Sequence, residues 1–220
     1  MQDPSRPPPK SFGRIRNRYL TDKKKELLYR RLDDYRLDPA SMLPIQTHLE
    51  IGFGDGEHLF LQAKEYPHIY WIGAEPYLNG VAQLLMRLED TPLDNLALWP
   101  DDVWGLLPML PSHSIDRVYL LFPDPWPKRK HFKRRLVQHD FIDQMARLIS
   151  SNGELFIVTD HGEYASWIVY QFTSHGFFSW QAQTPVDWLT PPKSWKETRY
   201  QKKALAGSTS YYLHFLANKG

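Results

Sequence analysis

The sequence contains no cysteine, which excludes disulfide bonds, thiolate metal ligands and a cysteine nucleophile. It has no uncharged apolar run that approaches the ~20 residues of a membrane-spanning helix. The first ten residues are polar and rich in proline, without the apolar centre of a secretory signal. We therefore expect a soluble, cytoplasmic protein with no membrane partner.

The histidines also lack the spacing of metal ligands. His58, His113, His131, His161 and His175 share no pattern typical of a metal site, so no metal is predicted. What the chain does have is apolar residues: 42% of its 220 residues are hydrophobic and 14% are aromatic. This composition can bury a substantial core and excludes a wholly disordered chain. The length suits one large domain with an appended arm.

Positive charge is concentrated in two segments. Residues 1–36 carry eleven Lys or Arg against five Asp or Glu, and residues 128–135 add six positive charges and no negative one. The overall charge of +2 therefore leaves −10 for the rest of the chain. Such charge runs are often merely solvated faces. Two of them on an acidic body, one beside the motif described below, favour a polyanion-binding surface.

The order of apolar segments predicts an α/β fold with a mostly parallel sheet flanked by helices. Residues 1–19 are expected to form an arm, and a helix begins at Thr21 or Asp22 and ends at Asp38-Pro39. We place this arm and helix in residues 1–40 and one domain in residues 41–220. The predicted strands are His48–Ile51, Tyr70–Ala74, Leu96–Leu98, Arg117–Phe122, Glu154–Thr159, Phe177–Gln183 and Ser210–Leu216, with helices at about 57–66, 78–89, 138–149 and 162–174.

A glycine-rich turn follows the first predicted strand. In Leu49–Glu57 an apolar run leads directly into Gly52, Gly54 and Gly56, and a helical segment follows. Glu75 ends the next strand, nineteen residues beyond Gly56, where a carboxylate can accept hydrogen bonds from both ribose hydroxyls of an adenosine cofactor. The alternative is a purely structural turn. The glycine spacing differs from that of dinucleotide sites, which disfavours an oxidoreductase.

The charge around this turn limits which class of cofactor can bind there. Glu50 and Asp55 place negative charge near the glycines, which would oppose a diphosphate and suit a sulfonium cation. The turn and Glu75 together resemble the S-adenosylmethionine site of Rossmann-like methyltransferases, so we predict S-adenosylmethionine as the cofactor.

A proline-rich loop follows the fourth predicted strand. Leu121–Pro127 contains three prolines that hold Asp124 and Trp126 at the edge where an open α/β sheet places its ligands. A structural turn with a buried Trp is the alternative. The basic segment that follows at once favours the functional interpretation.

The segment Phe122–Leu136 closely resembles the signature of the bacterial TrmB family, the tRNA (guanine-N7)-methyltransferases. Gly13-Arg14, Leu49–Gly56 and Thr159-Asp160 resemble the family's arm, its cofactor loop and its Thr-Asp pair. The family shows Thr-x-Phe/Tyr-Glu near its C-terminus, and here Gln201 in Thr198–Gln201 replaces the glutamate.

The resemblance implies a Rossmann-like methyltransferase fold, tRNA as partner with a variable-loop guanine as target, and a monomer or homodimer. The cofactor residues that it implies are Glu50, Gly52, Gly54, Gly56 and Glu75, with Asp101 and Asp102 at the adenine-binding turn. The implied guanine and RNA residues are Asp124, Lys128, Arg134, Arg135, Asp160, Thr198 and Gln201.

Guanine N7 carries a free lone pair, so methylation there requires no general base. Asp124 and Asp160 are the predicted catalytic residues, because a carboxylate on the Watson–Crick edge would identify guanine and stabilise the positive charge that it gains. From the sequence alone Asp160 is equally an N-cap of the following helix, and both roles could coexist. Two other functions stay open: methylation of another RNA group, such as an exocyclic amine, and RNA binding with little catalysis.

Overall fold

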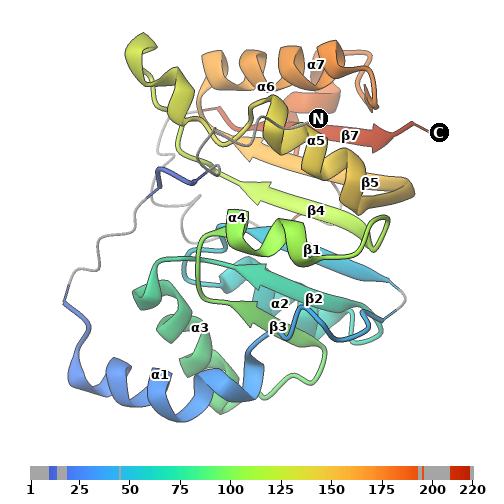
Figure 1. The fold of residues 1–220 in the computed structure, drawn as a ribbon. Helices are drawn as coiled ribbons and strands as arrows, with labels where there is room; N and C mark the ends of the chain where they lie inside the picture. Colours follow the sequence, from blue (N-terminus) through green and yellow to red (C-terminus); the bar gives the residue numbers. More distant parts are fainter. Residues whose placement is uncertain (1–9, 14–18, 45, 193–194, 196–208, 219–220) are drawn as a thin grey trace, which may run out of the picture.

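The computed structural model describes residues 10–13, 19–44, 46–192, 195 and 209–218. In this part of the chain one sheet of seven strands forms the centre, in the order β3-β2-β1-β4-β5-β7-β6 (Figure 1). β7 is antiparallel to both of its neighbours, β5 and β6, and the pairs among β1 to β5 are parallel. The strands are β1 (Thr47–Ile51), β2 (Tyr70–Ala74), β3 (Leu96–Trp99), β4 (Ile115–Leu121), β5 (Ile149–Thr159), β6 (Phe178–Trp180) and β7 (Tyr211–Ala217). The predicted mostly parallel α/β sheet is confirmed.

Helices cover both faces of this sheet, and each face has its own core. Apolar side chains of α1, α2 and α3 pack with Trp71 and Tyr119, whereas those of α4, α5 and α6 pack with Val118 and Leu155. The alternation of neighbouring strand residues between the two cores follows from the period of two along a strand. The helices are α1 (Asp22–Tyr35), α2 (Glu57–Glu65), α3 (Leu78–Asp90), α4 (Val103–Leu106), α5 (His139–Leu148), α6 (Gly162–His175) and α7 (Pro185–Leu189), with 3₁₀ helices η1 (Leu107–Met109) and η2 (Arg129–Arg134).

Helix α1 lies against α3 at the β3 edge of the sheet (Figure 1). Its Leu27 and Leu32 are buried, as the helical spacing of apolar residues predicted. The division of the chain at residue 40 stays a prediction. No helix in the described ranges is both long and apolar enough to cross a membrane.

The last predicted strands differ from the structure at one point. The expected strand 177–183 is shortened to β6, because the chain turns away at Thr184. The backbone N–H groups of Gln183 and Thr184 donate to the Asp187 carboxylate, at 2.9 and 2.8 Å, in the capping box that starts α7. A strand cannot continue once these backbone donors serve a helix.

A cavity of about 300 Å³ lies on the face of α2, near the amino ends of β1 and β4. His48, Arg117, Glu154 and His214 line it together with aromatic rings. Glu154 pairs with Arg117 and with His214, and these partners lower its pKa to about 2. These four charged or polar side chains form a cluster in the cavity, at the opposite end of the strands from the predicted site.

This cluster makes the fold sensitive to acid through His48. Burial, and secondarily the charge of Arg117, lowers the pKa of His48 to about 4. Because an unfolded histidine titrates near pH 6.5, the stabilisation is full above that pH and is lost as the pH falls towards 4. Relative to pH 7.5, we expect a loss of about 2 kcal/mol from this residue at pH 5.

Urea unfolding of the natural protein and of His48→Gln checks this expectation. The difference in unfolding free energy between the two should shrink by about 2 kcal/mol between pH 7.5 and pH 5. An equal difference at both pH values would contradict the assigned neutral, buried imidazole.

Candidate active site

The predicted site residues gather at one edge of the sheet. Gly52 follows β1, Glu75 follows β2, Asp101 follows β3, Asp124 lies just beyond β4, and Asp160 follows β5. Because β1 to β5 are parallel, their carboxyl ends meet at this edge. The edge is the usual ligand position of an open α/β sheet.

The glycine turn combines an unusual backbone with open space. Gly52, Gly54 and Gly56 have φ of 73°, 60° and 72°, in the left-handed region that favours glycine. A Cβ built on Gly52 or Gly54 would meet no atom of the described residues within 4 Å, whereas one on Gly56 would lie 2.7 Å from Leu84. A ligand can therefore approach the backbone at the first two glycines, and Gly56 is required for packing against α3.

Glu75 stabilises the glycine turn through a hydrogen bond. Its carboxylate is largely buried and accepts hydrogen bonds from the N–H groups of Gly54 and Tyr77, both at 2.8 Å. Burial raises its pKa, as do the charges of Glu50 and Asp124, and the two backbone donors oppose this rise. Each oxygen keeps a further lone pair, so contact with ribose hydroxyls is compatible with these bonds and stays a prediction.

Glu50 has a structural partner on α2. Its side chain is 2% exposed, and its Oε2 lies 2.7 Å from Nδ1 of His58 on α2. The carboxylate thus links β1 to α2, the two elements that flank the glycine turn. Glu50 thus has a positioning role in the fold, and its expected contact with the cofactor stays a prediction.

Asp101 and Asp102 also separate in role. Asp102 is the N-cap of α4 and accepts a hydrogen bond from the N–H of Trp104 at 3.1 Å. Its two oxygens further accept from the N–H and the hydroxyl of Ser11, both at 2.7 Å. Asp101 is exposed and accepts from the N–H of Asp102. The contacts of Asp101 and Asp102 with the adenine of a cofactor stay predictions.

The loop after β4 is held in a strained conformation. Phe122 and Trp126 have φ of 51° and 44°, which costs a non-glycine residue about 1–3 kcal/mol. The prolines at 123, 125 and 127 restrict the chain further. Asp124, in the middle of this loop, is exposed, and its charge raises the pKa of Glu75. The loop therefore presents a carboxylate close to the glycine turn.

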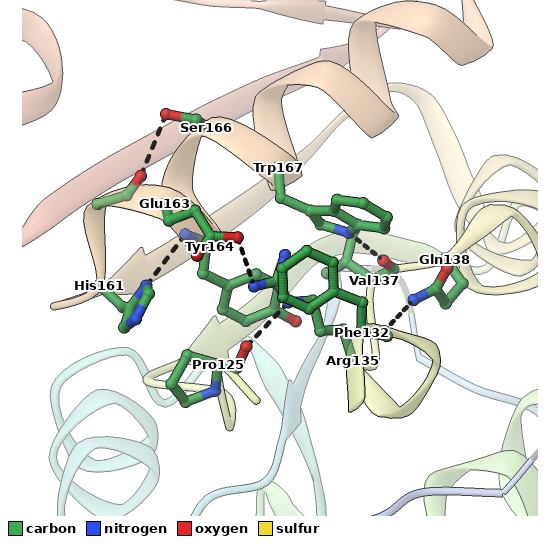
Figure 2. A network of polar contacts seen from close by, with 11 residues as sticks. Pro125, Phe132, Arg135, Val137, Gln138, His161, Glu163, Tyr164, Ser166 and Trp167 are labelled. Carbon is green, nitrogen blue, oxygen red and sulfur yellow. Dashed lines mark hydrogen bonds and ion pairs between the residues drawn. The ribbon is translucent and has the colours of Figure 1, made fainter. Parts of the chain in front are cut away.

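Arg135 was expected to contact RNA, but the structure buries it. It is 2% exposed, its Nε donates to the Pro125 carbonyl at 2.8 Å, and its Nη2 pairs with Glu163 at 3.0 Å. The guanidinium stacks over Phe132 at 3.6 Å from the ring centre and lies 5.1 Å from that of Trp167 (Figure 2). Arg135 thus anchors the strained loop to α6, and its burial leaves no surface for a phosphate.

The remaining cations of this segment stay near the surface. Residues 128–134 form the loop into η2 and η2 itself, and Lys128, Arg129 and Lys130 are exposed. Arg134 is half-buried and lies 4.9 Å from the centre of the Trp126 ring. None of the η2 residues is buried, so no apolar periodicity in the sequence indicated this helix.

Asp160 is not the N-cap of the helix that follows it. His161 occupies that position, and its Nδ1 accepts a hydrogen bond from the N–H of Tyr164 at 3.2 Å (Figure 2). Because an imidazole already caps α6, the helix does not require the Asp160 carboxylate. A role for Asp160 towards the substrate stays a prediction. Thr198 and Gln201 lie outside the described residues.

Gly80 on α3 is a site residue that the sequence did not indicate. A Cβ at this position would lie 2.0 Å from the carbonyl oxygen of Gly54, so helix and turn are in direct backbone contact. At Gly105 on α4, by contrast, a Cβ would have ordinary contact with Trp99 at 3.6 Å. Within the described residues no group of three or more His, Asp or Glu is placed to hold a metal.

We therefore expect Gly80→Ala to displace the glycine turn. Overpacking against backbone should cost about 1–3 kcal/mol of unfolding free energy, and cofactor affinity should fall about tenfold or more. The matched Gly105→Ala should be neutral or slightly stabilising, since alanine favours a helix. Urea unfolding and calorimetry with S-adenosylhomocysteine measure both. Equal behaviour of the two variants would contradict the close contact of α3 with the turn.

Comparisons with known proteins agree with this geometry. Residues 45–213 match a family described as "Putative methyltransferase". A tRNA (guanine-N(7)-)-methyltransferase of Rhodospirillum rubrum is 46% identical over 184 residues, which cover 82% of this chain and 72% of that protein. Another, of Hyphomonas neptunium, is 40% identical over 215 residues, with 94% and 98% covered.

Among solved structures, a precorrin-6y C5,15-methyltransferase from Geobacter metallireducens has a TM-score of 0.54 at 14% identity, with 88% of this chain and 87% of that chain covered. This likeness shows the fold, which is the Rossmann-like fold of methyltransferases. Together with the relatives of high identity over most of their length, it leads to one assignment. The chain belongs to the tRNA (guanine-N(7)-)-methyltransferase family.

Proposed function

We propose that this protein transfers a methyl group from S-adenosylmethionine to N7 of a guanine in tRNA, in the variable loop. The observation that carries the proposal is the row of acidic groups beside the glycine turn: Glu75, Asp124 and Asp160, at the ends of β2, β4 and β5. The cofactor, when bound, supplies an electrophilic methyl group on a sulfonium sulfur. The chain supplies binding, orientation and charge.

The residues around the turn suit that cofactor. Gly52 and Gly54 leave open space, and Glu75 offers its remaining lone pairs at the end of β2. The negative charges of Glu75 and Asp124 suit a cation and disfavour a second anion. A positively charged sulfonium compound therefore fits the donor set of this edge.

The substrate side requires orientation rather than proton removal. Guanine N7 has an in-plane lone pair, so the protein must hold it in line with the methyl group. Asp160 or Asp124 would accept hydrogen bonds from N1–H and the 2-amino group of guanine. The same carboxylate would stabilise the positive charge that the ring acquires during transfer. The strained loop, which Arg135 anchors, restricts the position of Asp124.

The exposed cations of residues 128–130 would bind tRNA phosphates beside the candidate active site. We propose a cytoplasmic location, because the proposed substrate is tRNA.

Neutralising Lys128, Arg129 and Lys130 to Gln should weaken tRNA binding. It should also reduce the slope of log affinity against log salt by roughly one unit per lost phosphate contact. Cofactor affinity should barely change. The control is Lys64→Gln, at an exposed position on α2. Filter binding at several salt concentrations measures the slope. A slope that is equal in all three proteins would mean that residues 128–130 are solvated surface only.

Nucleoside analysis of unmodified tRNA treated with the protein and labelled S-adenosylmethionine tests the function itself. We expect label in 7-methylguanosine. Label in a nucleoside methylated on an exocyclic amine would replace the proposal with another RNA methyltransferase. Tight tRNA binding without any label would replace it with an RNA-binding protein.

A further inference from the structure

A short stretch of the N-terminal arm lies at the carboxyl edge of the sheet. Its first attachment is Ser11, whose N–H donates to Oδ2 and whose hydroxyl donates to Oδ1 of Asp102, both at 2.7 Å. Both oxygens of one carboxylate thus hold one residue that is 91 positions away. Hydrogen bonds to a charged group are about twice as strong as neutral ones, so this is a firm attachment.

The second attachment is to the loop after β4. The Phe12 ring lies 5.8 Å from the guanidinium of Arg134, which itself lies 4.9 Å from the Trp126 ring. Phe12 is 38% exposed, so the core does not account for its position. A Cβ on Gly13 would lie 3.6 Å from Oδ2 of Asp124, so the backbone of the arm runs beside that carboxylate.

These two attachments lie on opposite sides of the ends of β2 and β1. Asp102 follows β3 and Asp124 follows β4, and the sheet order puts β2 and β1 between them. Three strand spacings of about 4.8 Å separate such positions, a distance that residues 11–13 and their side chains can bridge. In Figure 1 this stretch is the separate dark-blue segment beside the arrowhead of β4. By the sheet order, the strand ends that carry the glycine turn and Glu75 lie between its two attachments.

We propose that Ser11, Phe12 and Gly13 form a strap across the candidate active site, and that Ser11 and Phe12 are positioning residues for methyl transfer. The strap fixes the Asp124 loop relative to the turn after β3. Its catalytic consequence rests on the proposed function, but its structural consequence does not. A loop with two residues in left-handed conformations needs such outside support to stay in one conformation.

Backbone hydrogen exchange of the purified protein with S-adenosylhomocysteine tests the strap without any methylation. We expect Ser11→Ala and Phe12→Ala each to speed exchange in a peptide covering 119–128 by about tenfold. Ser11→Thr keeps the hydroxyl and should behave as the natural protein. Tyr170→Ala is the control, because it removes an aromatic ring that is 66% exposed on α6. Unchanged exchange in both strap variants would overturn the proposal.

Single-turnover methyl transfer to tRNA tests the positioning role. The rate should fall about tenfold in Ser11→Ala, with the tRNA dissociation constant nearly unchanged. In an Asp102→Ala background, Ser11→Ala should cause no further loss, because the two residues act as one contact. Faster exchange with an unchanged rate would overturn the positioning role. If the natural protein transfers no methyl group, the proposed function fails, and the exchange experiment still decides the strap.

Discussion

Glu75→Ala is expected to weaken binding of S-adenosylhomocysteine by about 30-fold to 1,000-fold. A buried carboxylate that accepts from two ribose hydroxyls should contribute about 2–4 kcal/mol. The same carboxylate accepts from the N–H groups of Gly54 and Tyr77, so its loss also releases the glycine turn. Both effects act in the same direction on affinity. Calorimetry on a folded variant measures the change.

Glu75→Gln serves as the matched control for size. An amide oxygen can still accept, but the amide nitrogen would face a backbone donor, so we expect an intermediate loss. Because burial raises the pKa of Glu75, lowering the pH should protonate it sooner than an ordinary glutamate. Affinity should therefore decline on acidification in the natural protein and less so in Glu75→Ala. Unchanged affinity in a folded Glu75→Ala would contradict the cofactor assignment.

Arg135→Ala is expected to lower the free energy of unfolding by about 3 kcal/mol. The change removes a buried side chain, leaves the Pro125 carbonyl without its donor at 2.8 Å, and ends the stacking on Phe132. The partner Glu163 is half exposed, so Glu163→Ala should cost less than about 1 kcal/mol. Urea unfolding of both variants measures the difference.

The tRNA-binding slope separates this structural role from an RNA contact. Since Arg135 is buried, the salt dependence of tRNA binding should be the same in a folded Arg135→Ala as in the natural protein. Normal stability with a reduced slope would show instead that the guanidinium reaches a phosphate.

The sequence predicted the elements that apolar patterns determine. Runs such as Tyr70–Ala74 are buried strands, the glycines that follow the first strand form a left-handed turn, and the amphipathic segments between strands are helices. Parallel strands then place Glu75, Asp124 and Asp160 at one edge, because each follows a strand end. Hydrophobic periodicity and the right-handed connection of parallel strands are sufficient to predict the sheet and the edge at which the site lies.

Contacts between distant residues were not predictable in this way. Arg135 stands among six cations that look alike in the sequence, and only the fold shows that one of them is buried against α6. The bond from Ser11 to Asp102 joins segments without any shared pattern. The cap of α6 was also missed, because Asp is a common N-cap and His161 is a rarer one.

In the proposed reaction, the carboxyl edge of this sheet directs a methyl group to N7 of guanine in tRNA. The most direct test uses a tRNA transcript in which 7-deazaguanosine replaces the target guanosine, so that a C–H group takes the place of N7. Labelled methyl transfer should proceed on the guanosine transcript and be absent on the substituted one, while both bind with similar affinity. Equal methylation of the two transcripts would contradict the claim.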